Sequence, residues 1–139
     1  MANQTKETLF ITVDSLHGLL TDNDTSNDPY IIDIRNSEHY ALGHIDGAEH
    51  MSLFTMAKAE NLTKIPENIT VVVYCDTGQK AAMSTTVLKL LGYENVRNLK
   101  FGMQAWTQNN TVNPIRYDPA TDGRDYEVVS GSSSNVAGI

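Results

Sequence analysis

Two apolar runs of strand length place the strongest constraint on the fold of this chain. Residues 30–34 (YIIDI) and 69–74 (ITVVVY) are mostly apolar and rich in β-branched side chains. They lack the regular alternation of polar and apolar residues that marks a strand with one solvent-exposed face. Such runs are typical of strands buried on both faces, as in a parallel sheet, and we expect the run at 69–74 at the sheet centre.

Helical signals separate these runs from each other and from further short strands. We expect the remaining elements to be a strand at 9–11, helices at 13–20, 37–42, near 53–59 and at 81–91, a strand at 96–99 and a helical turn at 103–108. In the helix at 81–91, the predicted core-facing stripe consists of Met83, Val87, Leu90 and Leu91. Strands that alternate with helices indicate an α/β fold with a largely parallel sheet.

The length of 139 residues is typical of one domain. We expect residues 1–7 to be a flexible N-terminus and residues 8–110 to form the domain. Residues 111–139 lose the helical and strand periodicity and are expected to be a C-terminal extension. Its last residues are rich in Gly and Ser, and we expect them to be disordered.

The formal net charge of −7 and the single cysteine narrow the classes of function. Nucleic acid and anionic membranes repel an acidic chain, so we expect neither as a partner. A lone cysteine excludes an intrachain disulfide and a multi-cysteine zinc site. No apolar run approaches the roughly 18 residues of a transmembrane helix, and the N-terminus shows no signal peptide. We expect a soluble monomer, with the compartment open between the cytoplasm and export as a mature form.

Cys75 lies where an α/β fold concentrates its chemistry. It directly follows the run at 69–74, and residues 76–80 (DTGQK) lead from it into the next helix. Ligand sites of open α/β sheets lie at the carboxyl ends of strands, and free N–H groups at a helix N-terminus bind anions and favour a thiolate. Cys75 is therefore interpreted as a nucleophile, in preference to a buried, inert thiol, which is the commoner state of a free cysteine.

Four motifs, in order along the chain, resemble those of the single-domain rhodanese family, the thiosulfate sulfurtransferases. They are YIIDIR (30–35) followed by Glu38, His39 and Tyr40; GHIDGA (43–48); VVYCDTGQK (72–80); and GY (92–93) followed by Val96, Leu99 and GMQAW (102–106). The resemblance covers about residues 8–108. It implies a rhodanese-like α/β fold with a central parallel sheet flanked by helices on both faces.

The resemblance also implies a two-step sulfur transfer. The Cys75 thiolate would take sulfane sulfur from a small anionic donor such as thiosulfate and pass it to an acceptor, which is cyanide in assays and a thiol in cells. The loop of Asp76, Thr77, Gly78, Gln79 and Lys80 would bind the donor and stabilise a Cys75 persulfide through its backbone amides. This chemistry needs no metal and no organic cofactor.

Departures from the family pattern leave the substrate preference open. Lys80 stands where arginine is commoner, Ala81 where serine is commoner, and Phe101 where the last motif has its first glycine. A phosphatase or arsenate reductase of this fold has an arginine six positions after the cysteine, where this chain has Ala81, and phosphoryl transfer needs such a cation. The alternatives that remain are a non-catalytic binding or regulatory module and a persulfide carrier for a partner protein.

Other polar residues in the motifs are expected to have mostly structural roles. Arg35 is a candidate substrate contact, but with Asp33 it more often fixes the loops around such a site. His44 is expected to orient a turn. The four histidines lack the spacing of a metal motif, so no metal site is expected.

Overall fold

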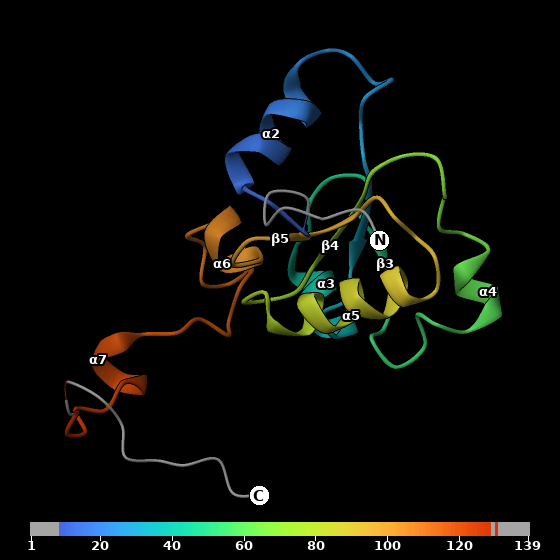
Figure 1. Ribbon diagram of the computed structural model, residues 1–139. Coiled ribbons are helices and arrows are strands. Elements are labelled where there is room, and N and C mark those ends of the chain that lie inside the picture. Colours follow the sequence, from blue (N-terminus) through green and yellow to red (C-terminus); the bar gives the residue numbers. More distant parts are fainter. Residues whose placement is uncertain (1–8, 129, 131–139) are drawn as a thin grey trace, which may run out of the picture.

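Five parallel strands form the sheet at the centre of the fold (Figure 1). The computed structural model describes residues 9–128 and residue 130, so the expectations for residues 1–7 and for the last residues of the chain lie outside the described part. The strands are β1 (Phe10–Ile11), β2 (Tyr30–Asp33), β3 (Glu49–His50), β4 (Val71–Tyr74) and β5 (Val96–Leu99), in the spatial order β1-β5-β4-β2-β3.

Strand β4 occupies the sheet centre, as the sequence predicts. It pairs with β2 on one side and β5 on the other, so that Val72 lies level with Ile31 and Arg97. All of its side chains are buried. The strand begins at Val71, two residues later than expected, and Ile69 before it remains 39% exposed.

Side chains of β4 alternate between two apolar clusters, one on each face of the sheet. Val71 and Val73 pack with α5 (Gln79–Leu90) and with the segment 51–65. Val72 and Tyr74 pack with α2 (Val13–Thr21) and α6 (Met103–Trp106). Helices therefore cover both faces of a parallel sheet, which confirms the expected fold class.

The segment after β3 differs from its prediction. Helix α3 (Ser37–Leu42) ends at Gly43 as expected, but the helix expected near 53–59 is wrong. The chain instead makes hydrogen-bonded turns from Ser52 to Lys58, and α4 spans Ala59–Leu62. These turns bury Met56 and leave Phe54 90% exposed, so the segment lacks the continuous apolar face that holds a longer helix.

The apolar stripe predicted for α5 faces the wrong way. Met83, Val87, Leu90 and Leu91 are 60%, 37%, 84% and 50% exposed. The side that packs on the sheet carries Ala81, Ser84, Thr85 and Leu88 instead. Two of these are very small, which allows α5 to lie close to the sheet beneath it.

Two elements had no counterpart in the sequence analysis. Strand β3 is only two residues long and carries polar side chains, and it exists because Glu49 and His50 pair with the end of β2. Helix α7 (Pro119–Asp122) is capped by Asp118, whose side chain accepts a hydrogen bond from Ala120 N at 2.9 Å. A strand this short gives no periodic signal in the sequence. Helix α7 did have a signal, because an Asp N-cap followed by proline at the first helical position is a common way for a helix to begin.

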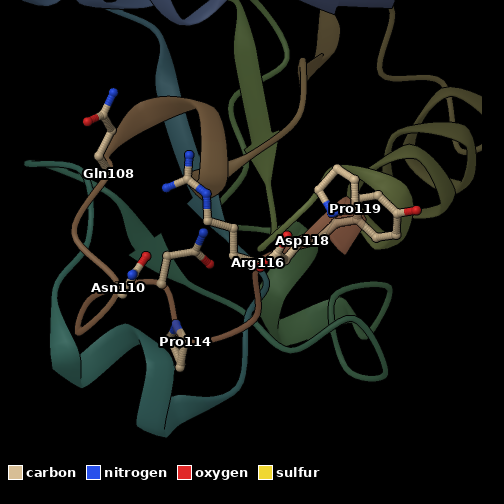
Figure 2. Close-up of a pocket in the computed structure, with 8 residues that line it drawn as sticks. Gln108, Asn110, Pro114, Arg116, Asp118 and Pro119 are labelled. Carbon is tan, nitrogen blue, oxygen red and sulfur yellow. The ribbon is translucent and has the colours of Figure 1, made fainter. Parts of the chain in front are cut away.

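In the described part of the C-terminal segment, the buried contacts with the domain lie at its beginning. Val112 packs against the cluster around α2 and α6, and Asn113 is 1% exposed. Farther along, α7 extends away from the sheet (Figure 1). The chain between α6 and α7 surrounds an open hollow of about 760 Å³, shown in Figure 2.

A buried ion pair ties the end of β2 to the loops around it. Arg35 binds the Asp33 carboxylate with an Nη2–Oδ2 distance of 2.7 Å, and both side chains are fully buried. The guanidinium also donates to the carbonyls of Gly43 and Val112, at 2.6 and 3.2 Å. Burial, reinforced by the Asp33 charge, raises the pKa of Tyr74 far above its usual value, so its protonated hydroxyl donates to Asp33 at 2.7 Å.

We expect Arg35→Met to destabilise the protein by about 3–5 kcal/mol, because it leaves the Asp33 carboxylate buried without its cation. Urea unfolding monitored by circular dichroism measures the change. The matched control is Arg124→Met, which removes an arginine that is exposed and contacts only carbonyls of its own loop. An unchanged free energy of unfolding in Arg35→Met would contradict the role given to this ion pair.

Candidate active site

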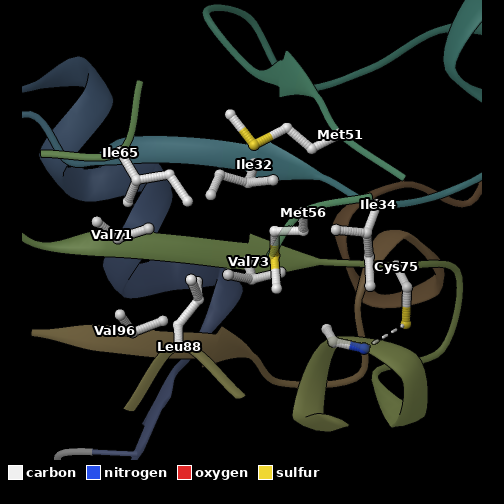
Figure 3. Close-up of a cluster of buried hydrophobic side chains, with 11 residues drawn as sticks. Ile32, Ile34, Met51, Met56, Ile65, Val71, Val73, Cys75, Leu88 and Val96 are labelled. Atoms are coloured by element: carbon white, nitrogen blue, oxygen red, sulfur yellow. Dashed lines mark hydrogen bonds between the residues drawn. The ribbon is translucent and has the colours of Figure 1, made fainter. Parts of the chain in front are cut away.

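Cys75 lies at the carboxyl end of β4, one residue beyond the strand and four before α5. It is 2% exposed and belongs to the apolar cluster beneath α5, beside Ile34 and Val73 (Figure 3). Its position between the central strand and a helix N-terminus is the one expected from the sequence. Apolar surroundings alone would suit an inert thiol, so the polar contacts of the sulfur decide its character.

Backbone amides surround the sulfur of Cys75. The Sγ atom accepts hydrogen bonds from the N–H groups of Gly78, at 3.0 Å, and Ala81, at 3.4 Å. Figure 3 draws the second of these as a dashed line. Ala81 lies in the first turn of α5, where N–H groups have no partner within the helix. The amides and the helix dipole favour negative charge on a sulfur at this place, so the arrangement suits a thiolate or a persulfide anion.

Gly78 gives the loop the shape that directs these amides inward. Its φ angle is +105°, a conformation that residues with a Cβ atom rarely adopt. The Gly78 carbonyl in turn accepts a hydrogen bond from Asn98 Nδ2 at 3.0 Å. Asn98 projects from β5 and is 4% exposed, so it fixes the loop from below.

Helix α6 holds the loop from its other side. The N–H groups of Met103 and Gln104 donate to the carbonyls of Cys75 and Asp76, at 2.9 and 3.0 Å. This contact requires glycine at position 102, where φ is +59° and an added Cβ atom would lie 2.3 Å from the Cys75 carbonyl oxygen. The last of the four sequence motifs therefore has a physical role here: it fixes the backbone at Cys75 and Asp76.

The side chain of Asp76 is turned toward α3. His39 Nδ1 lies 3.0 Å from Asp76 Oδ1, and both residues are only 9% exposed. This contact joins the loop to α3 across the sheet edge. Neither this role of His39 nor that of Asn98 was predicted; a polar residue within a strand was the only signal for Asn98.

The remaining loop residues lie toward solvent. Thr77 is half-buried and its hydroxyl donates to the side-chain oxygen of Gln79, while the side chains of Gln79 and Lys80 are exposed. Lys80 borders a cavity of about 320 Å³ together with Ile34 and Phe54. The structure thus places Cys75, the loop amides and the exposed ammonium group of Lys80 in one region, with the cavity next to Lys80.

Arg35 also borders this cavity, but its guanidinium has other partners. Its guanidinium is fully buried and is already bound to Asp33, Gly43 and Val112. This arrangement favours the structural role over direct contact with substrate. His44 likewise stacks on Tyr40, with 3.8 Å between ring centroids, and its Nδ1 lies 3.0 Å from the Tyr40 carbonyl oxygen at the turn after α3.

Comparison with known proteins places this geometry in a family. Residues 12–109 match the family model of the rhodanese-like domain. The chain belongs to the rhodanese-like domain family. The motifs quoted from the sequence all lie within the matched region or at its edge, and the fold prediction that they carried is confirmed.

Individual rhodanese-like relatives show the extent of the similarity. The chain is 30% identical over 87 residues to the probable adenylyltransferase/sulfurtransferase MoeZ of Mycobacterium tuberculosis, covering 63% of this chain and 22% of MoeZ. It is 35% identical over 68 residues to the thiosulfate sulfurtransferase PspE of Escherichia coli K12, covering 48% of this chain and 64% of PspE. The chain thus spans less than two thirds of the length of either relative.

Solved structures agree with the rhodanese-like assignment. The crystal structure of a rhodanese-like domain protein from Staphylococcus aureus superposes with a TM-score of 0.63 at 27% sequence identity. The alignment covers 71% of this chain and 91% of that protein. The human single-domain sulfurtransferase TSTD1 gives a TM-score of 0.58 at 23% identity, with 70% and 93% covered, and this likeness shows the fold alone.

We also searched the described residues for a metal site, a membrane-spanning helix and other pockets. No group of three or more His, Cys, Asp or Glu side chains within residues 9–128 is arranged to hold a metal ion. In the same part of the chain, no helix has the length and apolarity to cross a bilayer. The hollow of Figure 2 and another of about 840 Å³ between α2 and β5 are both lined without Cys75.

We expect Gly102→Ala to destabilise the protein by about 1–3 kcal/mol beyond the strain of its positive φ, because the new methyl group overlaps the Cys75 carbonyl. Gly47→Ala is the matched control: Gly47 also has a positive φ, +79°, but no atom lies within 4 Å of an added Cβ. Thermal unfolding of both variants separates overlap from strain. Equal losses would show that the clamp between α6 and the loop contributes nothing.

Proposed function

We propose that this protein is a sulfurtransferase that moves sulfane sulfur from a small anionic donor such as thiosulfate to a thiophilic acceptor. Cys75 carries the sulfur as a persulfide between the two half-reactions. The observation that carries the proposal is the pair of backbone N–H groups, from Gly78 and Ala81, directed at Cys75 Sγ. Such amides stabilise the negative charge of a thiolate and of a persulfide anion. An inert cysteine in the core needs no hydrogen-bond donors of this kind.

In the first half-reaction, the Cys75 thiolate attacks the outer sulfur of thiosulfate. A bond forms between Cys75 Sγ and that sulfur, and the S–S bond of thiosulfate breaks. Its electron pair leaves with sulfite, so the negative charge of the former thiolate now lies on the terminal sulfur of the persulfide. The first-turn amides of α5 and the loop amides are the groups that receive this charge.

In the second half-reaction, an acceptor nucleophile attacks the terminal sulfur of the persulfide. With cyanide, a carbon–sulfur bond forms, the bond between the two sulfurs breaks, and thiocyanate leaves. The electron pair returns to Cys75 Sγ as a thiolate, which the Gly78 and Ala81 amides again stabilise. Neither half-reaction needs a metal or an organic cofactor.

The relatives support sulfur transfer in general. Both MoeZ and PspE are sulfurtransferases by name, and PspE is named for thiosulfate. The loop of this chain has no arginine, so it lacks the bidentate cation that phosphoryl transfer needs at an oxyanion. Arg35, which borders the same cavity as Lys80, is already bonded to Asp33 and two carbonyls.

We expect the wild-type protein to form thiocyanate from thiosulfate and cyanide, and to gain the mass of one sulfur atom when incubated with thiosulfate alone. Cys75→Ser is expected to lose both signals, because the hydroxyl is a far weaker nucleophile at neutral pH. Thiocyanate is measured as its iron complex and the adduct by intact-mass spectrometry. A folded wild type with a free thiol that shows neither signal would favour a non-catalytic binding module.

Lys80→Ala is expected to raise the KM for thiosulfate about two- to fivefold and to leave the mass gain at saturating donor intact. The factor follows from the roughly 0.2–1 kcal/mol of an exposed ionic contact. Lys64→Ala removes the same charge from an exposed position outside the loop, and serves as the control for the general field of the protein. If both variants keep the wild-type KM, Lys80 does not recruit the donor.

A further inference from the structure

Helix α5 exposes an apolar stripe that the core does not use. Met83, Val87, Leu90 and Leu91 are between 37% and 84% exposed. Their spacing of four, three and one residues places them on one side of the helix. Exposed apolar groups scattered singly are ordinary, but four gathered on one helix side mark an interaction surface.

The stripe begins at the candidate active site. Lys80 lies on the same side of α5, three residues before Met83, and it belongs to the loop that follows Cys75. Lys80 also borders the cavity of about 320 Å³, together with Phe54, which is 90% exposed. We call the set of Phe54, Lys80, Met83, Val87, Leu90 and Leu91 the α5 surface.

The cavity beside this surface lies close to Cys75, although Cys75 does not line it. Ile34 borders the cavity and also packs in the same cluster as Cys75, and Figure 3 shows the two side chains next to each other. Cys75 itself is 2% exposed. A sulfur this buried is within reach of a small anion, whereas a macromolecule reaches it only with a narrow segment.

The charge around the α5 surface is opposite to that of the molecule. The segments 51–65 and 79–91 both pack on the same face of the sheet. Segment 51–65 carries Lys58, Lys64 and one acidic residue, Glu60, and Lys80 stands at the start of the stripe on α5, whereas the whole chain has a formal net charge of −7. A partner that covers this face is therefore complementary if its rim is acidic and its centre apolar.

We propose that the α5 surface docks an acidic partner protein that presents the sulfur-accepting thiol on a narrow segment. The proposal rests on the proposed function and names its acceptor. The partner's thiolate attacks the terminal sulfur of the Cys75 persulfide; a new S–S bond forms on the partner and the bond to Cys75 Sγ breaks. The electron pair stays on Cys75, so a thiolate is regenerated and the partner leaves as a persulfide anion.

Two other occupants fit the surface less well. A second copy of this chain bound through the same face would bring the lysines of both copies together, which costs free energy. A nucleic acid would pair with the lysines but would leave the apolar stripe without a partner, and the acidic remainder of the chain would repel it. An acidic protein satisfies both the charge and the apolar side chains.

The test uses two synthetic peptides that differ only in charge. One is an amphipathic helix of leucine and glutamate followed by Gly-Gly-Cys, and the other has lysine in place of every glutamate. Fluorescence anisotropy of labelled, cysteine-blocked peptides measures binding to wild-type protein without any sulfur chemistry. We expect the glutamate peptide to bind at least tenfold more tightly than the lysine peptide, with the difference shrinking as salt rises.

Surface variants locate the binding. Met83→Asp combined with Leu90→Asp places two charges on the α5 surface at positions that are 60% and 84% exposed, so folding is expected to persist. Tyr126→Asp combined with Val128→Asp adds the same charges at positions that are 80% and 92% exposed in the C-terminal segment. The first pair is expected to weaken binding of the glutamate peptide at least tenfold and the second to leave it unchanged, while thiocyanate formation stays at the wild-type rate in both.

Transfer to the peptide thiol completes the test. Persulfide-loaded protein, freed of donor, is mixed with the unblocked glutamate peptide, and mass spectrometry follows the sulfur from Cys75 to the peptide. We expect faster transfer than to free cysteine at equal concentration, and loss of that advantage in the Met83/Leu90 variant.

The outcomes separate this proposal from the proposed function. Equal binding of the two peptides, equal effects of the two variant pairs, tighter binding of a single-stranded oligonucleotide, or a dimer in solution that the Met83/Leu90 variant dissociates would each overturn the docking surface. Absence of a Cys75 persulfide together with charge-selective binding would contradict the sulfurtransferase function and leave the surface assignment standing.

Discussion

The close approach of α5 to the end of β4 governs both the active site and the surface around it. Ala81 N lies 3.4 Å from Cys75 Sγ, so the first turn of the helix must lie almost on the sheet. Only small side chains fit between the two, and Ala81 and Ser84 occupy this contact with no exposed area. Leu88, two turns later, packs on the sheet, but Met83, Val87 and Leu90 lie on the outer side of the helix. The backbone amides around Cys75 Sγ and the exposed apolar stripe are two results of one packing constraint.

Buried polar contacts hold this geometry at the carboxyl ends of the strands. The Asp33–Arg35 pair fixes the end of β2, and Asn98 and the Gly102 turn fix the loop after β4. Each is a group whose burial is unfavourable unless its partner is in place, so displacing any of them costs more than one average hydrogen bond. The loop therefore keeps its amides directed at Cys75 without help from a ligand.

The sequence was sufficient where one strong signal decided the outcome. The unbroken apolar runs identified β2 and β4, and the sequence placed Cys75 between a strand and a helix, where the structure has it. The sequence did not predict features that depend on a contact between distant segments. Strand β3 exists because it pairs with β2, and Asn98 supports the loop because it donates a hydrogen bond to the Gly78 carbonyl. The α5 stripe was wrong for a related reason, because periodicity shows that one helix side is apolar but not which side faces the sheet.

In the proposed function, the donor and the acceptor are recognised by different parts of α5, namely its first turn and its outer side. The donor anion needs only what the loop supplies, namely backbone N–H groups and one exposed lysine, and such groups distinguish anions poorly. In the proposed docking, the acceptor meets the outer side of α5 and Phe54, whose exposed side chains can change without altering the buried contacts of Cys75. A fold that keeps its nucleophile under amides from the helix start can thus change its acceptor through the rest of the same helix.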